Sequence, residues 1–101
     1  MGKILTPRER LKWAKEKAEQ IESLLKARLP PEDFEKIGIE PHWRKVLIYI
    51  IEFLPKDSYE KFLEVMNLEK ARWDPVWRSW EIRTPLRVSQ PLVEGREVKP
   101  S

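Results

Sequence analysis

Residues 43–54 have the sequence WRKVLIYIIEFL, and the conformation of this stretch decides the fold class of the chain. The stretch lies between Pro41 and Pro55, and proline favours the first position of a helix but cannot continue one. Its many β-branched and aromatic residues also suit a buried strand, which stays open as the alternative. Because helix signals flank the stretch on both sides, we predict a helix from Pro41 to Leu54. It would be apolar on nearly every side and would therefore lie at the centre of the core.

Four further helices are expected, because prolines and capping patterns mark their starts. Residues 6–9 (TPRE) combine an N-cap threonine, a first-turn proline and the glutamate of a capping box. Residues 57–60 (DSYE) repeat this capping pattern, and Asp74-Pro75 starts another helix. A short helix after Pro30 is expected to close at Gly38, since glycine is common just past a helix end. The expected ranges are residues 7 to about 28, 31–37, 58 to about 67 and 74 to about 80.

These signals predict an all-α fold, a small bundle of four to five helices with an extended, proline-punctuated C-terminal arm. The chain has 101 residues, which suits one domain with one core. We assign residues 1–81 to the helical domain and residues 82–101 to the arm. Pro85, Pro91 and Pro100 punctuate the arm, whose few large apolar residues cannot form a core of their own.

The composition excludes several kinds of site. The chain has no cysteine, a single histidine (His42) and three glycines (Gly2, Gly38 and Gly95). Disulfides, thiolate nucleophiles and zinc sites that need sulfur are therefore excluded, and the three glycines are too far apart in the sequence to form a glycine-rich phosphate loop. No serine or aspartate is spaced to complete a triad with His42. We expect no enzymatic activity, no metal, no cofactor and no small-molecule substrate.

The sequence also bears on location and source. The N-terminus lacks the apolar region of a secretory signal, and no stretch approaches the ~18 apolar residues of a membrane span. We expect a cytoplasmic protein. Charged residues make up 37% of the chain while asparagine, glutamine and cysteine are scarce, a bias typical of proteins from thermophiles, and such a source is expected.

The chain has more large apolar side chains than the core of a single copy can bury. This favours a non-enzymatic role in protein–protein interaction or as a structural subunit that assembles with itself or with a larger complex. The first helix carries an apolar seam at coiled-coil spacing. The seam residues are Leu11, Ala14, Ala18, Ile21 and Leu25. A weaker second line contains Trp13 and Leu24, and it faces either the rest of the chain or a second subunit.

Three tryptophans at helical spacing, Trp73, Trp77 and Trp80, would share one side of the predicted last helix. They either anchor that helix to the bundle or, with the arginines between them, form a protein-binding patch; base stacking is a third interpretation. Extended pieces of the arm can add to the edge of a partner's sheet. The predicted partner-binding residues are Trp13, Leu24, Trp73, Trp77, Arg78, Trp80, Leu86, Val88 and Leu92.

The alternative function is that of a nucleic-acid-associated protein, a small helical subunit of a nucleoprotein complex. The net charge of +3 is too small to imply a polyanionic partner by itself. Basic residues of the first helix, which also include Arg8 and Arg10, and arginines of the arm would contact phosphates. Acidic residues alternate with them, as on a solvated, ion-paired helix. The residues predicted for this alternative are Lys12, Lys15, Lys26, Arg28, Arg83 and Arg87.

Overall fold

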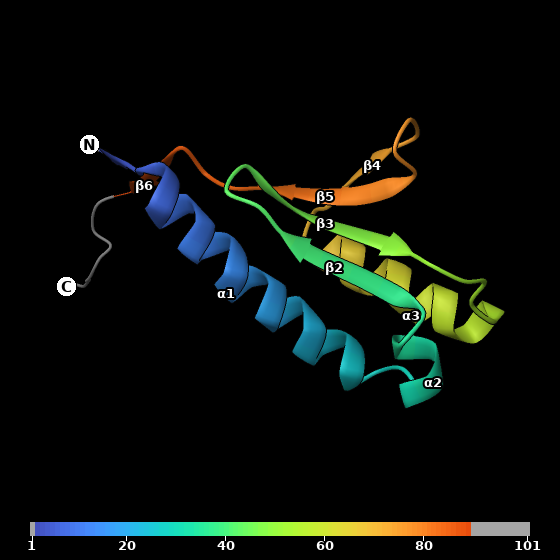
Figure 1. Cartoon of the computed structure of the whole chain (residues 1–101). Coiled ribbons are helices and arrows are strands. Elements are labelled where there is room, and N and C mark those ends of the chain that lie inside the picture. Colours follow the sequence, from blue (N-terminus) through green and yellow to red (C-terminus); the bar gives the residue numbers. More distant parts are fainter. Residues whose placement is uncertain (1, 90–101) are drawn as a thin grey trace.

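The computed structural model describes residues 2–89, and this part of the chain is mixed α/β (Figure 1). Its centre is a four-stranded antiparallel sheet in the order β2-β3-β5-β4, and β1 and β6 form a separate two-stranded ribbon. The predicted all-α bundle is therefore wrong. The elements, in chain order, are β1 (Gly2–Ile4), α1 (Pro7–Lys26), α2 (Pro31–Phe34), β2 (Ile37–Pro41), β3 (Lys45–Ile50), α3 (Lys56–Leu68), β4 (Arg72–Asp74), β5 (Ser79–Arg83) and β6 (Arg87–Ser89).

The helices α1 and α3 lie on the same face of the sheet (Figure 1). Each precedes a β-hairpin, β2–β3 after α1 and β4–β5 after α3, so a helix followed by a hairpin occurs twice, with the short α2 inserted only in the first. The two hairpins join through their second strands, β3 and β5, which form the middle of the sheet. This arrangement leaves the opposite face of the sheet without a covering helix.

The stretch that decides the fold is a hairpin and not a helix. Val46 and Ile48 are fully buried, while Leu47 and Tyr49, which alternate with them, are only partly buried. This is the alternation of a strand with one face against the core. The amide of His42 donates to the carbonyl of Lys45 at 2.8 Å and closes the turn between β2 and β3. Pro41 fits in β2 because that strand is at the edge of the sheet, where a missing amide is tolerated.

The predicted helix over residues 74–80 is also wrong, because these residues form the β4–β5 hairpin. Asp74 Oδ1 accepts hydrogen bonds from the amides of Val76 (2.9 Å) and Trp77 (3.3 Å). Arg78 then takes a left-handed conformation with φ 50°. The aspartate does cap backbone amides, as its pattern indicated, but it caps a turn.

The remaining helix predictions differ in outcome. The capping box of α1 is confirmed: Thr6 Oγ1 accepts from the Glu9 amide at 3.2 Å, and the Glu9 carboxylate accepts from the Thr6 amide at 3.0 Å. The bond from the Thr6 amide is the main reason that the pKa of Glu9 is lowered. The capping box predicted before α3 is absent, because its N-cap is Pro55 and Ser58 is buried, donating to Asp33. Gly38 lies in β2 and ends no helix.

The core lies between the two helices and the sheet. Four of the five seam residues predicted in α1 are buried, and they meet the inward residues of α3 and of the central strands. The largest fully buried side chains are Phe62, Ile21, Leu25, Ile48, Met66, Val46 and Val65. Across residues 2–89, none of the helices combines the length and the apolar character needed to cross a bilayer.

The predicted C-terminal arm begins inside the sheet. Ile82 and Arg83 belong to β5, where Ile82 is buried against the core. Residues 87–89 form β6 and pair antiparallel with β1, with Val88 opposite Lys3. Residues 90–101, which include Leu92, lie outside the described residues.

Candidate functional site

The uncovered face of the sheet carries a groove of about 600 Å³ at the end where the β4–β5 hairpin turns. Its floor comes from β2 and β3 and its wall from the hairpin. We call it the sheet groove. Its lining residues are Glu40, Lys45, Leu47, Tyr49, Ile50, Trp77, Arg78 and Ser79.

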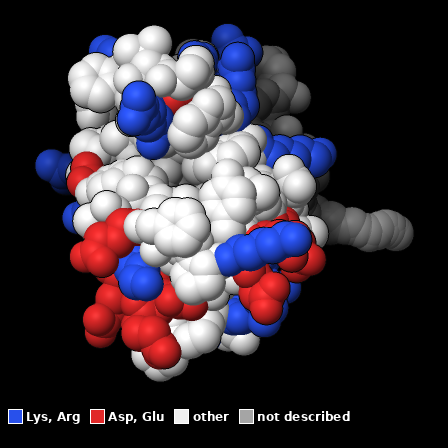
Figure 2. Space-filling view, turned by 90° about the vertical axis from the view of Figure 1, so that its right-hand side faces the viewer, with Lys and Arg blue, Asp and Glu red and all other residues white. Residues whose placement is uncertain are grey.

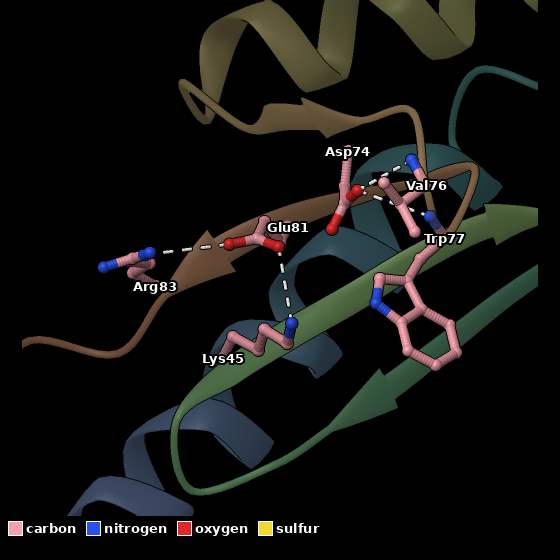
Figure 3. A network of polar contacts seen from close by, with 6 residues as sticks. All are labelled: Lys45, Asp74, Val76, Trp77, Glu81 and Arg83. Atoms are coloured by element: carbon pink, nitrogen blue, oxygen red, sulfur yellow. Dashed lines mark hydrogen bonds and ion pairs between the residues drawn. The ribbon is translucent and has the colours of Figure 1, made fainter.

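Trp77 forms the wall of the sheet groove and is 75% exposed. The two hydrogen bonds accepted by Asp74 fix the backbone that carries it, and the left-handed Arg78 turns the chain back into β5. Figure 3 shows the indole reaching from the hairpin across the uncovered face toward β3. A large aromatic ring is thus held in place above the sheet and not folded into the core.

The floor of the groove is apolar at its centre. Leu47 and Tyr49 project from β3 on the uncovered face, and Tyr49 is the register partner of Gly38 in β2. A Cβ atom at position 38 would overlap the Tyr49 ring, so the ring lies directly over the glycine. The Tyr49 hydroxyl donates to the Glu40 carboxylate, which holds the ring flat on the sheet.

The bond between Tyr49 and Glu40 shifts both groups. It is the largest cause of the lowered pKa of Glu40 and of the raised pKa of Tyr49, because the ionised carboxylate accepts a hydrogen bond from the protonated phenol. Folding therefore favours the protonated phenol. The stabilisation by this bond is fully present between pH 4.5 and pH 10.0, the ordinary pKa values of the two groups. It is lost as the pH rises through the raised pKa of Tyr49 or falls through the lowered pKa of Glu40.

Replacing Glu40 by glutamine is expected to lower the pKa of Tyr49 toward its ordinary value. The change removes the negative charge that retains the phenolic proton and leaves the fold intact, since Glu40 is exposed. The measurement is an alkaline titration followed by tyrosinate absorbance. It is done in a Tyr59→Phe background, because the chain has two tyrosines. An unchanged titration midpoint would show that Glu40 does not hold the proton in solution.

Charges around the groove are unevenly paired. Glu81 lies 3.4 Å from Lys45 Nζ and 3.7 Å from Arg83 Nε, so one carboxylate serves two cations (Figure 3). Arg78 at the groove wall has no carboxylate within ion-pairing distance among residues 2–89. The hydroxyl of Ser79, at the base of the wall, is buried without a hydrogen-bond partner in the same part of the chain.

Apolar side chains continue from the groove onto the adjoining end of the molecule. Phe53, in the loop after β3, is 87% exposed, and Val76, at the hairpin tip, is 83% exposed. Ile51 is also exposed. Figure 2 views this end and shows a broad uncharged surface across its middle, with acidic groups mostly in the lower half of the view and basic groups distributed around it.

A second hollow, of about 590 Å³, lies at the opposite end of β5, beside the β2–β3 turn. Trp43 at this turn is contacted by two guanidinium groups, those of Arg10 and Arg44. We call this hollow the Trp43 cleft. Among residues 2–89, its only acidic lining residue is Glu81.

The single histidine belongs to no metal-ligating cluster among residues 2–89. His42 lies in the β2–β3 turn with its Nε2 atom 3.4 Å from a carboxylate oxygen of Glu40. The described residues hold no group of three side chains that are arranged to ligate a metal.

No family model, curated protein or solved structure matches this chain. What the surfaces bind must therefore be inferred from their own chemistry.

The three tryptophans predicted to share one side are divided between the two faces of the sheet. Trp73 and Trp80 are register partners, with ring centroids 5.3 Å apart on the helix side, and Trp80 also meets Phe62 edge-on at 6.5 Å. Trp77 and Arg78 instead line the sheet groove. The cause is the backbone, because residues 73 and 80 pair across a hairpin while residue 77 lies in its turn.

The other predicted partner residues are dispersed. Trp13 and Leu24 are half-buried and pack against the core of their own chain. Leu86 is exposed and lines the Trp43 cleft.

The residues of the nucleic-acid alternative do not form one surface. Lys12 and Lys15 are exposed on α1, whereas Lys26 and Arg28 lie at the far end of that helix; Arg28 donates to the Leu24 carbonyl. Arg83 alone of this set lines the Trp43 cleft, while Arg87 is in β6. The contribution of Trp43 and Arg44 was missed, since no sequence signal links residue 10 with residues 43 and 44.

Proposed function

We propose that this protein is a non-enzymatic interaction module that binds a segment of a partner protein in the sheet groove. The observation that carries the proposal is Trp77, which a fixed turn holds 75% exposed above the apolar floor of the groove. Tryptophan and arginine are the side chains most enriched at interface hot spots, and here they are adjacent. We further propose that the protein acts in the cytoplasm, because a chain without cysteine needs no oxidising compartment.

The chemistry of the groove defines the partner segment. Leu47, Tyr49 and Trp77 would enclose one large apolar side chain, which would leave water on binding. Arg78 lacks a carboxylate partner within the described chain and would pair with an acidic residue of the ligand. Lys45 already has Glu81 at 3.4 Å and offers less to a ligand. The expected ligand is therefore a peptide segment with a large apolar anchor next to aspartate or glutamate.

A random-peptide display selection against the purified protein tests this proposal. We expect the selected peptides to share an aromatic or aliphatic anchor beside an acidic residue. Trp77→Ala should weaken their binding by about 30-fold, which is the effect of losing a hot-spot residue. Peptides selected on the Arg78→Glu variant should lack the acidic residue beside the anchor. The affinities are measured by fluorescence polarisation.

Trp43→Ala is the matched control, because it removes an indole at the other end of β5 and should leave peptide binding unchanged. The absence of any enriched peptide, or equal binding by the Trp77→Ala variant, would refute the proposal. Sedimentation at micromolar concentration covers the case in which the partner is a second copy of this chain. A dimer that Trp77→Ala dissociates would identify the occupant as that copy.

A further inference from the structure

The Trp43 cleft holds two arginines in a fixed arrangement. The guanidinium carbon of Arg44 lies 4.7 Å from the centroid of the Trp43 ring and that of Arg10 lies 5.0 Å from it. Stacking on an aromatic ring engages the face of a guanidinium group and leaves the N–H donors at its edge available. The indole therefore fixes the positions of two guanidinium groups and does not itself use their N–H donors.

These two arginines are electrostatically unpaired. Within residues 2–89, no carboxylate approaches Arg10 or Arg44 to ion-pairing distance. Lys45 and Arg83 also line the cleft, and both share the single carboxylate of Glu81. The described chain thus gives the cleft four basic side chains against one acidic side chain, an excess that an anion would neutralise.

Two buried polar groups in the cleft lack hydrogen-bond partners in the described chain. One is the Nε of Arg10 and the other is the hydroxyl of Thr84, a residue only 4% exposed. The Thr84 amide donates to the Arg44 carbonyl at 3.0 Å, which places the threonine beside the stacked arginine. A buried donor without an acceptor costs free energy, so a small shift of these side chains toward the oxygens of a ligand in the cleft would be favoured.

We propose that the Trp43 cleft binds the phosphate of a nucleotide unit. The paired N–H donors of a guanidinium group match the spacing of phosphate oxygens, and phosphate accepts several hydrogen bonds at once. The volume of about 590 Å³ exceeds what a bare phosphate ion fills and leaves room for the attached sugar and base. The nucleotide unit has two possible sources, a free mononucleotide and a single nucleic-acid strand. The site lies at the opposite end of β5 from the sheet groove and does not depend on the proposed peptide binding.

Fluorescence anisotropy with a short labelled single-stranded oligonucleotide tests the site, with a mononucleotide and inorganic phosphate as competitors. We expect binding at low salt that weakens steeply as salt is added. Arg44→Ala should reduce the affinity about tenfold, since it removes one charge-assisted contact. It should also reduce the slope of log affinity against log salt by about 1. Arg44 is exposed, so the variant is expected to fold, and circular dichroism is the measurement that checks this.

Lys61→Ala is the matched control, because Lys61 is an exposed basic residue of α3 outside the cleft. It should change the affinity by less than about twofold. An equal loss in the Lys61 and Arg44 variants would overturn the site in favour of diffuse attraction to a basic surface. Absence of binding by all three probes at low salt would also overturn it. Competition by the mononucleotide at matched phosphate concentration would identify the free nucleotide as the source, and competition by inorganic phosphate alone would refute a nucleotide unit.

Discussion

Replacing Phe62 by alanine is expected to lower the free energy of unfolding by about 3–5 kcal/mol. Phe62 is fully buried and is the largest fully buried side chain of the core. Its ring stacks on Tyr59 at 6.4 Å and meets Trp80 edge-on at 6.5 Å, so it joins α3 to β5. The variant would lose both the burial of the ring and the packing around the cavity left behind. Urea denaturation followed by far-UV circular dichroism measures the change.

Phe53→Ala is the matched control, because it deletes the same side chain at a position that is 87% exposed. It should change the free energy of unfolding by no more than about 0.5 kcal/mol. Similar losses in the two variants would mean that Phe53 is covered in solution, either by the chain or by a second copy. A small loss in Phe62→Ala alone would contradict the described core.

The parts of the fold that local chemistry encodes could be predicted from the sequence. The helix at residues 7–26 follows from a capping box and an apolar seam that lie within the helix itself, and the proline pair after Leu29 ends that region. These interactions join residues three or four apart. They need no knowledge of what the rest of the chain does.

The stretch at residues 43–54 could not be assigned in this way. Val46 and Ile48 face the core, yet Leu47 and Tyr49 on the other face are also apolar, so the strand alternation is hidden in the sequence. What makes the stretch a strand is pairing with β2 and with β5, and β5 follows about thirty residues later. The tryptophan spacing misled for the same reason, since positions 73, 77 and 80 fit a helix equally well.

The candidate site was predictable only in part. Trp77 and Arg78 were named from the sequence because aromatic and basic residues alternate there. Leu47 and Tyr49 were not, because a helix would have placed them in the core. The stacking of Arg10 and Arg44 on Trp43 joins the start of α1 to the β2–β3 turn, a contact created by the topology. Binding surfaces made from distant segments need the fold before they can be recognised.

Replacing Gly38 by valine is expected to destabilise the protein by about 1–3 kcal/mol, although valine is normally favoured in a strand. The new side chain would occupy the place of the Tyr49 ring, which lies directly over the glycine. The ring would have to swing into the sheet groove and give up its hydrogen bond to Glu40. Covering of a strand glycine by a cross-strand aromatic ring is a known way of stabilising such a position. Chemical denaturation measures the cost.

The same substitution in a Tyr49→Ala background shows whether the cost arises from this ring. With the ring absent, valine at position 38 should be neutral or stabilising, so the two changes should couple by about 1 kcal/mol or more. An equal cost in both backgrounds would show that the glycine is required for another reason. The Gly38→Val variant should also lose affinity for the peptides selected on the wild type, because a displaced Tyr49 fills the space between β3 and Trp77. The glycine therefore determines the shape of the groove as well as the stability of the sheet.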